Sequence, residues 1–376
     1  MPQAALDNVR GRVSPREGLG ASGRRRRYIL RTAAQLLLHD EAITKCGAYA
    51  HSGYVAIRAD GGRAAYGNLL QCRRIWDCPH CSALISAKRR GEVCELVEAH
   101  MRAGGSVYMA TLTVPHHRFD EPRQLRRAVA ACWQSVQSGK AWLTWKRRAG
   151  FVGSVRALEV THGGNGWHPH LHVLLFFRAG VLDSCVDSFG VFLGERWAAA
   201  AKRRGLGRVN VLEAFTFERA RSTELAGAYV TKWGTEWELL GGQSKAAIGG
   251  NRSPWQLLQS YADGDRYSGM LFRVYALAFK GARQLTYSVG LRDVYELREP
   301  GSDEELDLEE LAGKEIGAIT NQVYWALARR GLLVDLLEAL EQAPSWDTVV
   351  TYCFAHGVPW DERCRARPAA GYGVAT

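Results

Sequence analysis

Three histidines, His168, His170 and His172, alternate with other residues in one short segment. Successive side chains of a β-strand point to opposite faces, so residues two apart share a face and these imidazoles line one side of a strand. Packing alone does not explain three of them together, because buried ring nitrogens need hydrogen-bonding partners. Neutral imidazole is a common ligand for divalent metals. The spacing therefore predicts a metal site that uses at least two of these histidines.

Glu159 lies in the preceding apolar segment, residues 152–161, which also has strand character. The connecting residues 162–167 (HGGNGW) are typical of a hairpin turn, which would place Glu159 beside the histidines. A carboxylate with imidazoles forms a mixed N/O site that suits Mg²⁺ or Mn²⁺ and leaves positions open for phosphate oxygens. Two alternatives remain open: Glu159 is an ordinary edge-strand carboxylate, or His168 is the third ligand.

Tyr229 lies three residues before Lys232 in a segment of helical character, residues 218–240. That spacing places both side chains on one helix face. An ammonium near a phenol, or near the phosphate it attacks, stabilises developing negative charge and helps a group whose ordinary pKa is about 10 to react. The pair is therefore a candidate nucleophile with electrostatic assistance. The alternative is a core tyrosine followed by a solvated lysine.

Four of the nine cysteines follow the pattern C-x25-C-x5-C-x2-C; they are Cys46, Cys72, Cys78 and Cys81. The close pair Cys78–Cys81 is similar to the knuckles of structural zinc sites, in which four thiolates fill a tetrahedral shell. We therefore predict a structural Zn²⁺ site, in which His51 or His80 is an alternative to one thiolate. Unrelated buried cysteines are the competing interpretation. The odd total and the lack of a secretory signal are typical of a reducing compartment.

Lysine and arginine exceed the acidic residues by 49 − 38 = 11 in this chain of 376 residues. Such a surplus favours a polyanionic partner, because each neutralised phosphate releases a condensed counterion; the alternative is a basic protein that merely stays soluble. The hydrophobic fraction of 47% is that of a globular protein. No segment reaches the roughly 18 uninterrupted apolar residues of a membrane span, and no signal peptide is recognisable. We expect a cytoplasmic protein without a membrane partner.

The order of the segments predicts an α+β fold, with an antiparallel sheet and flanking helices. Predicted strands cover residues 106–114, 152–161, 168–177 and 208–214. Predicted helices cover residues 29–42, 82–103, 121–148, 183–204 and 218–240. We expect four parts: a basic, mobile N-terminal segment (1–44), a cysteine module with its exit helix (45–103), a central α+β domain (104–300) and a helical C-terminal region (301–376).

Residues 142–148 (WLTWKRR) combine tryptophans with basic side chains on one predicted helix. Such a segment could hold extruded single-stranded DNA by base stacking and phosphate contacts. It could equally present one buried and one solvated face.

Three segments in order resemble the motifs of the HUH endonuclease superfamily, and of its plasmid rolling-circle replication initiators in particular. They are TLTV (111–114), WHPHLHVLLF (167–176) and AYVTKW (228–233). The cysteine module and residues 280–292 are similar to the flanking regions of that family. The resemblance thus covers roughly residues 45–295 and identifies 104–300 as an endonuclease domain with the HUH nuclease fold.

The resemblance implies a catalytic metal held by His170, His172 and an acidic residue such as Glu159. Tyr229 would attack a phosphodiester in a hairpin origin, stay on the 5′ phosphate and free a 3′ hydroxyl that primes synthesis. Lys232 would assist.

The family also implies a glutamate that activates water for the terminating cleavage, and Glu224 is the candidate. It lies five residues before Tyr229, where four are expected. Five steps rotate about 140° around an ideal helix, so the two side chains would not share a face. Gly227 between them could permit a local distortion, and the role of Glu224 stays open.

Together these residues lead us to expect a rolling-circle replication initiator that nicks and joins single-stranded origin DNA through a 5′-phosphotyrosyl intermediate. Its expected partners are hairpin or single-stranded origin DNA, with a host helicase, a polymerase and a second copy of the chain as further candidates. The alternatives are a single-strand HUH transposase and a non-catalytic zinc-dependent DNA-binding protein that retains the histidines structurally. A hydrolase acting through metal-activated water alone would form no covalent DNA adduct.

Overall fold

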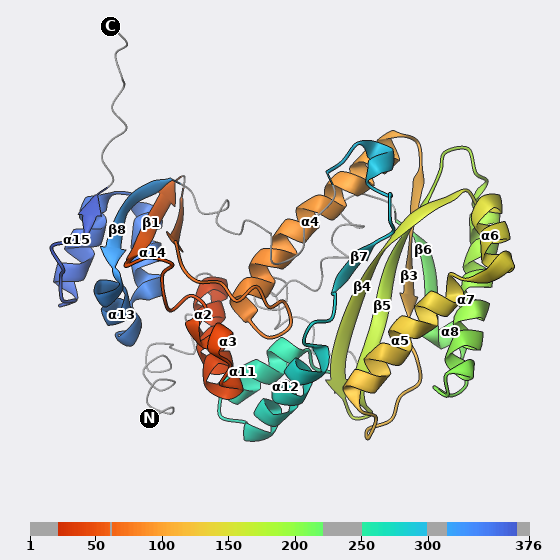
Figure 1. Ribbon diagram of the computed structural model, residues 1–376, viewed down its shortest axis with the longest axis horizontal. Helices are drawn as coiled ribbons and strands as arrows, with labels where there is room; N and C mark the ends of the chain where they lie inside the picture. Colours follow the sequence, from red (N-terminus) through yellow and green to blue (C-terminus); the bar gives the residue numbers. More distant parts are fainter. Residues whose placement is uncertain (1–21, 61, 221–249, 299–313, 367–376) are drawn as a thin grey trace, which may run out of the picture. The chain divides into compact units, whose positions relative to one another are not determined.

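The computed structural model describes residues 22–60, 62–220, 250–298 and 314–366 (Figure 1). Within these ranges the fold is α+β, with two antiparallel sheets flanked by helices, as predicted. The chain divides into two compact units. The terminal unit combines residues from 1–74, 78–81 and 305–376, and the central unit comprises 75–77 and 82–304. In the described part of the chain, no helix has both the length and the apolar character needed to cross a bilayer.

The central unit is built on a five-stranded sheet in the order β6-β3-β5-β4-β7. Its strands are β3 (Ser106–Leu112), β4 (Phe151–Gly163), β5 (Gly166–Phe177), β6 (Phe215–Arg219) and β7 (Leu285–Tyr287). The strands predicted over 106–114, 152–161 and 168–177 are confirmed. The turn predicted over 162–167 is shorter, because the pairing of β4 with β5 continues to Gly163 and Gly166.

The two faces of this sheet pack against different helices (Figure 1). On one face, α4 (Pro79–Arg102) shares a buried apolar cluster with the strands. The strand residues in that cluster include Val107, Met109, Val155, Ala157, Leu174 and Phe176. On the other face, Phe151 and Phe177 pack against Phe189 of α7 (Asp183–Arg203). The alternation along each strand therefore divides the core into two layers.

The helix predicted over 121–148 is two helices, α5 (Pro122–Val136) and α6 (Gly139–Arg148). Glu121 begins α5, because its carboxylate accepts the backbone N–H groups of Arg123 and Gln124. Gly139 interrupts the run with a φ of +83°, a left-handed conformation that glycine adopts at little cost. The later helices of this unit are α11 (Pro254–Ala262), α12 (Arg266–Phe279) and the 3₁₀ turn η2 (Asp293–Tyr295).

The strand predicted over 208–214 is wrong. Asn210 accepts the backbone N–H of Leu212 and caps the short helix α8 (Val211–Ala214). The strand that pairs with β3 is β6, which begins at Phe215, and Phe217 stacks on Tyr108. Asparagine at a helix start was the overlooked signal. The helix predicted over 218–240 begins inside β6, and its residues 221–240 lie outside the described ranges.

The terminal unit joins sequence segments from both ends of the chain. Its sheet has the order β2-β1-β8-β9, with β1 (Tyr54–Asp60), β2 (Arg63–Gly67), β8 (Glu315–Thr320) and β9 (Arg365–Ala366). Its helices are α2 (Ser22–Leu38), α3 (Glu41–Lys45), α13 (Asn321–Arg329), α14 (Leu333–Gln342) and α15 (Trp346–Ala355). Val55 and Ile57 of β1 share one buried cluster with Leu336 of α14. The C-terminal region is thus not purely helical, because β8 completes a sheet with β1.

The N-terminal segment predicted as mobile over 1–44 is helical from Ser22, where α2 begins, and α2 and α3 cover most of the helix predicted over 29–42. Arg24 and Arg25 belong to α2, where they form ion pairs with Glu341 and Asp335 of α14. These arginines are therefore engaged within the fold. Two side chains of α13 also bind the segment that follows α3. The Tyr324 hydroxyl donates to the Gly47 carbonyl at 2.7 Å, and the Trp325 indole N–H donates to the Ala48 carbonyl at 2.6 Å. Contacts between distant segments thus build this unit.

We predict that Leu336→Ala lowers the free energy of unfolding of the terminal unit by about 2–5 kcal/mol, because it leaves a cavity in the shared core. Leu336 is fully buried, whereas Leu212 is 92% exposed and serves as the matched control. Urea denaturation followed by tryptophan fluorescence measures both variants. Equal losses for Leu336→Ala and Leu212→Ala would contradict a single core shared by β1 and α14.

Candidate metal centres

The register of the β4–β5 hairpin assembles the first candidate centre. Glu159 pairs directly with His170, and His172 lies two residues further along the same face. Glu159 Oε2 is 2.9 Å from the Nε2 atoms of both His170 and His172. Ligand atoms of the three residues all lie within 4.8 Å of one another. Their side chains are between 12% and 24% exposed, so the site is shielded but open to solvent.

Partners behind the rings orient the two imidazoles. His170 Nδ1 lies 3.1 Å from the carbonyl oxygen of His168, and its N–H donates a hydrogen bond to that oxygen. His172 Nδ1 is 3.0 Å from the hydroxyl of Thr111 on β3. In neutral His170, the Nε2 lone pair then faces a carboxylate oxygen, and these two acceptors repel unless a proton or a cation lies between them. An imidazole held at Nδ1 with Nε2 directed to the site is the usual arrangement of a metal-binding histidine.

The cluster also shifts the acid–base equilibria of its members. Burial raises the pKa of Glu159, but the charges and hydrogen bonds of His170 and His172 outweigh burial and hold that pKa well below its usual range. Burial lowers the pKa of His170, but the Glu159 carboxylate more than compensates, so the pKa is raised. The site therefore favours an ionised carboxylate beside positive charge, which a divalent cation can supply in place of a proton.

His168 occupies a different position from the other two histidines. Its ring stacks on that of His116, with centroids 4.6 Å apart and planes 12° from parallel. Burial, followed by the charges of His170 and His116, lowers the pKa of His168 to about 3. Among the described residues, the group of converging ligand atoms contains Glu159 and not His168. Of the two alternatives left by the sequence, the geometry favours Glu159 as the third ligand.

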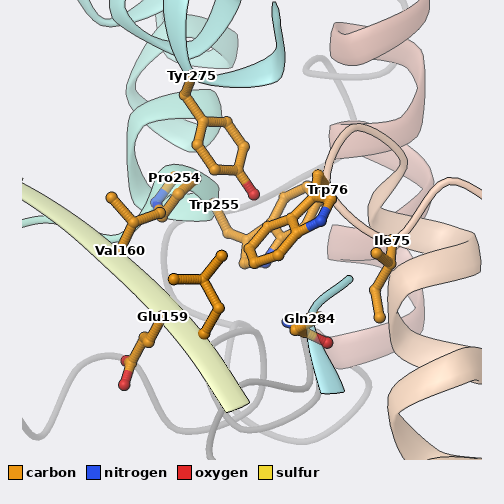
Figure 2. Close-up of a pocket in the computed structure, with 9 residues that line it drawn as sticks. Ile75, Trp76, Glu159, Val160, Pro254, Trp255, Tyr275 and Gln284 are labelled. Carbon is orange, nitrogen blue, oxygen red and sulfur yellow. The ribbon is translucent and has the colours of Figure 1, made fainter. Parts of the chain in front are cut away.

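The opposite face of β4 is apolar. Figure 2 shows a pocket in which Val160 lies near Trp76, Trp255 and Tyr275, while the Glu159 carboxylate points away from these rings. Trp76 donates its indole N–H to the Ala282 carbonyl at 2.7 Å, and all three rings are almost completely buried. This aromatic layer supports the strand that carries Glu159.

The candidate nucleophile and its neighbours, Tyr229, Lys232 and Glu224, lie outside the described residues. Their roles therefore rest on the sequence.

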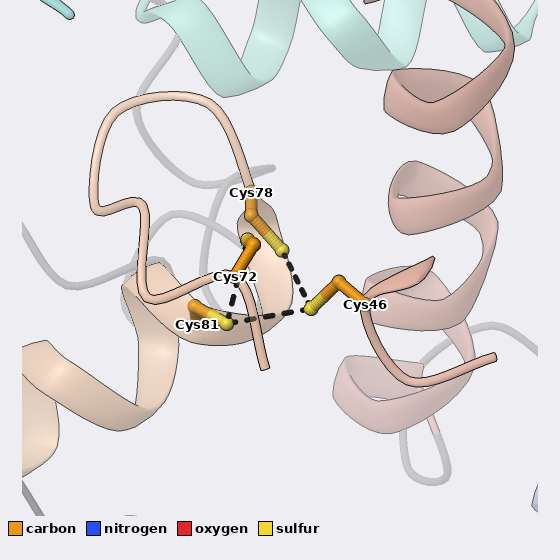
Figure 3. A group of neighbouring side chains, drawn as sticks. All are labelled: Cys46, Cys72, Cys78 and Cys81. Atoms are coloured by element: carbon orange, nitrogen blue, oxygen red, sulfur yellow. Dashed lines mark hydrogen bonds between the residues drawn. The ribbon is translucent and has the colours of Figure 1, made fainter. Parts of the chain in front are cut away.

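The four cysteines of the predicted zinc module converge in the terminal unit (Figure 3). Cys46 follows α3, and Cys78 and Cys81 lie at the start of α4. Cys46 Sγ is 3.7 Å from Cys78 Sγ and 3.5 Å from Cys81 Sγ, and Cys72 Sγ is 3.8 Å from Cys81 Sγ. A tetrahedral zinc ion with Zn–S bonds of about 2.3 Å needs sulfurs about 3.8 Å apart. All four are free thiols, so the donor set fits Zn²⁺.

The surroundings of the thiols suit the negative charge of a tetrathiolate site. Arg31 is buried beside Cys46 and Cys78; burial lowers the pKa of this guanidinium, but nearby tyrosines and cysteines outweigh burial and raise it. Gly47 has a φ of +62°, and a Cβ there would lie 2.1 Å from Arg31 Nη1. Only glycine therefore lets the chain turn after Cys46 while Arg31 stays close. Neither His51 nor His80 belongs to the cluster of converging ligand atoms.

Sequence reasoning missed the residues that position these ligands. Thr111 lies in the TLTV motif, but its contact with His172 joins residues 61 positions apart, and no local spacing rule reveals it. Arg31 is one of several arginines near the N-terminus, and the Tyr324 side chain that it contacts lies almost 300 residues further along the chain.

The basic, aromatic segment 142–148 does not offer all its rings to a ligand. Trp142 is buried and packs against Phe151 and Phe189. Trp145 stacks on Phe192, with the Arg148 guanidinium 5.0 Å from its ring centroid. Of the two interpretations of this segment, the buried and solvated faces of one helix therefore fit better.

The chain is similar to two Streptomyces proteins. One, from Streptomyces lividans, bears the name Protein rep and is 26% identical in a match that covers 77% of this chain and 79% of that protein. The other, from Streptomyces cyanogenus, bears the name Neomycin resistance protein and is 33% identical in a match that covers 33% of this chain and 34% of that protein. No protein-family model and no solved structure matches the chain.

We predict that the purified chain binds one zinc ion through its cysteine cluster and that Cys81→Ser releases it. Loss of one thiolate breaks the tetrahedral shell, and the terminal unit loses the associated folding energy. Metal content by mass spectrometry and the thermal midpoint report both effects. Cys185, outside the cluster, is the control, and Cys185→Ser should retain zinc. A zinc-free wild-type chain of unchanged stability would refute the prediction.

We further predict that Thr111→Val weakens Mn²⁺ binding at the histidine site by about tenfold or more, because the hydroxyl orients His172. Titration calorimetry measures the affinity directly. Thr216 pairs with Thr111 across the strands but is exposed, so Thr216→Val is the matched control and should bind as wild type does. Equal affinities for both variants would mean that Thr111 has no role in orienting the ligand.

Proposed function

We propose that this chain is a plasmid replication protein that initiates rolling-circle replication by nicking and rejoining one strand of origin DNA. The observation that carries the proposal is the convergence of Glu159, His170 and His172 on one face of an antiparallel sheet. Two imidazoles and one carboxylate form a donor set suited to Mg²⁺ or Mn²⁺ with positions left for phosphate oxygens.

Three further observations support this assignment. The similarity to Protein rep of Streptomyces lividans extends over most of both chains and favours a plasmid replication protein in general. The net charge of +11 suits a phosphate-rich partner. The order of the histidine and tyrosine motifs resembles that of the HUH endonucleases, whose fold is also an antiparallel sheet with flanking helices.

In the proposed reaction, Tyr229 is the nucleophile. A divalent ion bound to Glu159, His170 and His172 would supply Lewis-acid stabilisation of the scissile phosphate. The phenolic oxygen forms a bond to phosphorus while the bond from phosphorus to the 3′ oxygen breaks, so the protein stays on the 5′ phosphate. The phenol proton passes to solvent, and the departing 3′ oxygen takes up a proton. Lys232 offsets the developing negative charge, and Glu224 is the candidate base for the second cleavage.

The cysteine cluster has a structural role in this proposal. Zinc held by four thiolates leaves no open position for a substrate, so it would stabilise the terminal unit and take no part in chemistry. A non-catalytic DNA-binding protein would need the same zinc site but no nucleophile. A transposase of the same superfamily would share the chemistry and differ in the DNA that it recognises.

We predict a covalent protein–DNA adduct when the chain is incubated with Mn²⁺ and labelled single-stranded DNA that tiles the sequence flanking its gene. A label at the 3′ end should move into a denaturation-resistant protein band, because the protein holds the 5′ phosphate of that fragment. A label at the 5′ end should appear in a shorter, free strand. Gel electrophoresis under denaturing conditions separates these products.

Tyr229→Phe and addition of EDTA should each abolish the adduct, while Tyr229→Phe should leave DNA binding intact. Tyr267, a strongly exposed tyrosine of α12, provides a matched control, and Tyr267→Phe should form the adduct normally. Cleavage without any adduct would indicate a hydrolase that acts through water. Binding without cleavage in the wild type would indicate a DNA-binding protein and would overturn the proposed chemistry.

A further inference from the structure

An exposed aromatic ring lies in the loop that joins β3 to α5. This 115–120 loop has the sequence PHHRFD, and its Phe119 is 84% exposed. In the described part of the chain, one other phenylalanine, Phe354 of α15, is strongly exposed. Phenylalanine is usually buried, because its large apolar surface is unfavourable in water. Phe119 therefore offers a large apolar ring to a ligand, and the surroundings of the ring decide which ligand fits.

The loop is held in a defined conformation. The Asp120 carboxylate accepts the backbone N–H of His117 at 2.7 Å, and the Asp120 N–H donates to the His117 carbonyl at 3.0 Å. The next residue, Glu121, caps α5. Phe119 thus stands on a closed turn between a strand and a helix, so little conformational entropy is lost when a ligand binds to it.

The same loop packs against the hairpin that carries the candidate metal ligands. Gly166, at the start of β5, has a φ of +85°, and a Cβ there would lie 2.9 Å from the Cα of Arg118. On the loop, the His116 ring stacks on His168, and the centroid of His168 is 5.1 Å from that of His170. Two successive ring contacts therefore connect the loop to the metal site.

Phe119 is paired with a positive charge. The Arg118 guanidinium carbon lies 4.7 Å from the centroid of the Phe119 ring. An aromatic face next to a cation matches the two parts of a nucleotide, because a base stacks on the ring while a phosphate contacts the guanidinium. In double-stranded DNA the bases already stack on one another, so an unpaired base is the one available to this ring.

We propose that Arg118 and Phe119 form a stacking platform for an unpaired nucleobase close to the scissile phosphodiester. The inference rests on the proposed function, because it places single-stranded DNA at the metal site. The Phe119 ring carries one base, and Arg118 contacts a neighbouring phosphate. Stacking does not depend on base identity, so the platform positions the strand and leaves sequence recognition to other residues.

The test measures binding without cleavage, in EDTA, by fluorescence anisotropy of two labelled probes. One is an oligothymidylate of about 15 nucleotides, and the other is an abasic strand of the same length, which keeps the phosphates but lacks bases. Phe119→Ala should weaken binding of the oligothymidylate by about fivefold or more, the lower end of what one base–aromatic stack contributes. Binding of the abasic strand should be unchanged, and Phe119→Trp should retain wild-type affinity for both.

Phe354→Ala is the control, because it removes another strongly exposed phenylalanine ring, which belongs to the terminal unit, and it should bind both probes as wild type does. Thermal midpoints identify any variant that has lost its fold. The proposal is overturned if Phe119→Ala binds the oligothymidylate normally, or if it loses affinity for both probes equally. Binding that depends on Phe119 in a chain that forms no adduct would refute the nicking function alone, whereas normal adduct formation with binding independent of Phe119 would refute the platform alone.

Discussion

Glu159 faces His170 because β4 and β5 pair outward from a turn of two residues between Gly163 and Gly166. Side chains alternate along a strand, so a register shift by one residue would move the carboxylate to the opposite face, among Trp76, Trp255 and Tyr275. The hairpin register thus decides whether a donor set exists at all. The left-handed backbone at Gly166 and the aromatic layer behind Val160 both favour this register, and loop flexibility plays no part in bringing the ligands together.

One face of the sheet serves two purposes along its length. Under α4 it is apolar, with Ala157 and Leu174 in the core, and two residues further along each strand the same face carries Glu159 and His172. Ligands on strands that are fixed by a packed core lose little freedom when a cation binds. The packed core therefore fixes the two strands that carry Glu159, His170 and His172.

Local patterns made part of this structure predictable. Alternating histidines and the close pair Cys78–Cys81 encode proximity directly, because their spacing alone brings them together in any strand or knuckle. Contacts between distant segments left no such signal: the pairing of β1 with β8, the burial of Arg31 and the hydroxyl of Thr111 behind His172 depend on tertiary packing. Arg24 and Arg25 looked like a solvated basic tail because their acidic partners lie more than 300 residues away. The strand placed over 208–214 failed for a local reason, since Asn210 caps a helix there.

The sheet of the terminal unit has a consequence for how the chain is made. β1 is synthesised early, but its neighbour β8 begins only at residue 315, after the whole central unit has left the ribosome. Pairings that span so much sequence form slowly, whereas the central unit is nearly continuous in sequence and can fold first. Until the last segment arrives, one edge of β1 stays unpaired and prone to association with other strands. A nascent chain that stalls before that point would carry a folded central unit and an unfinished terminal unit.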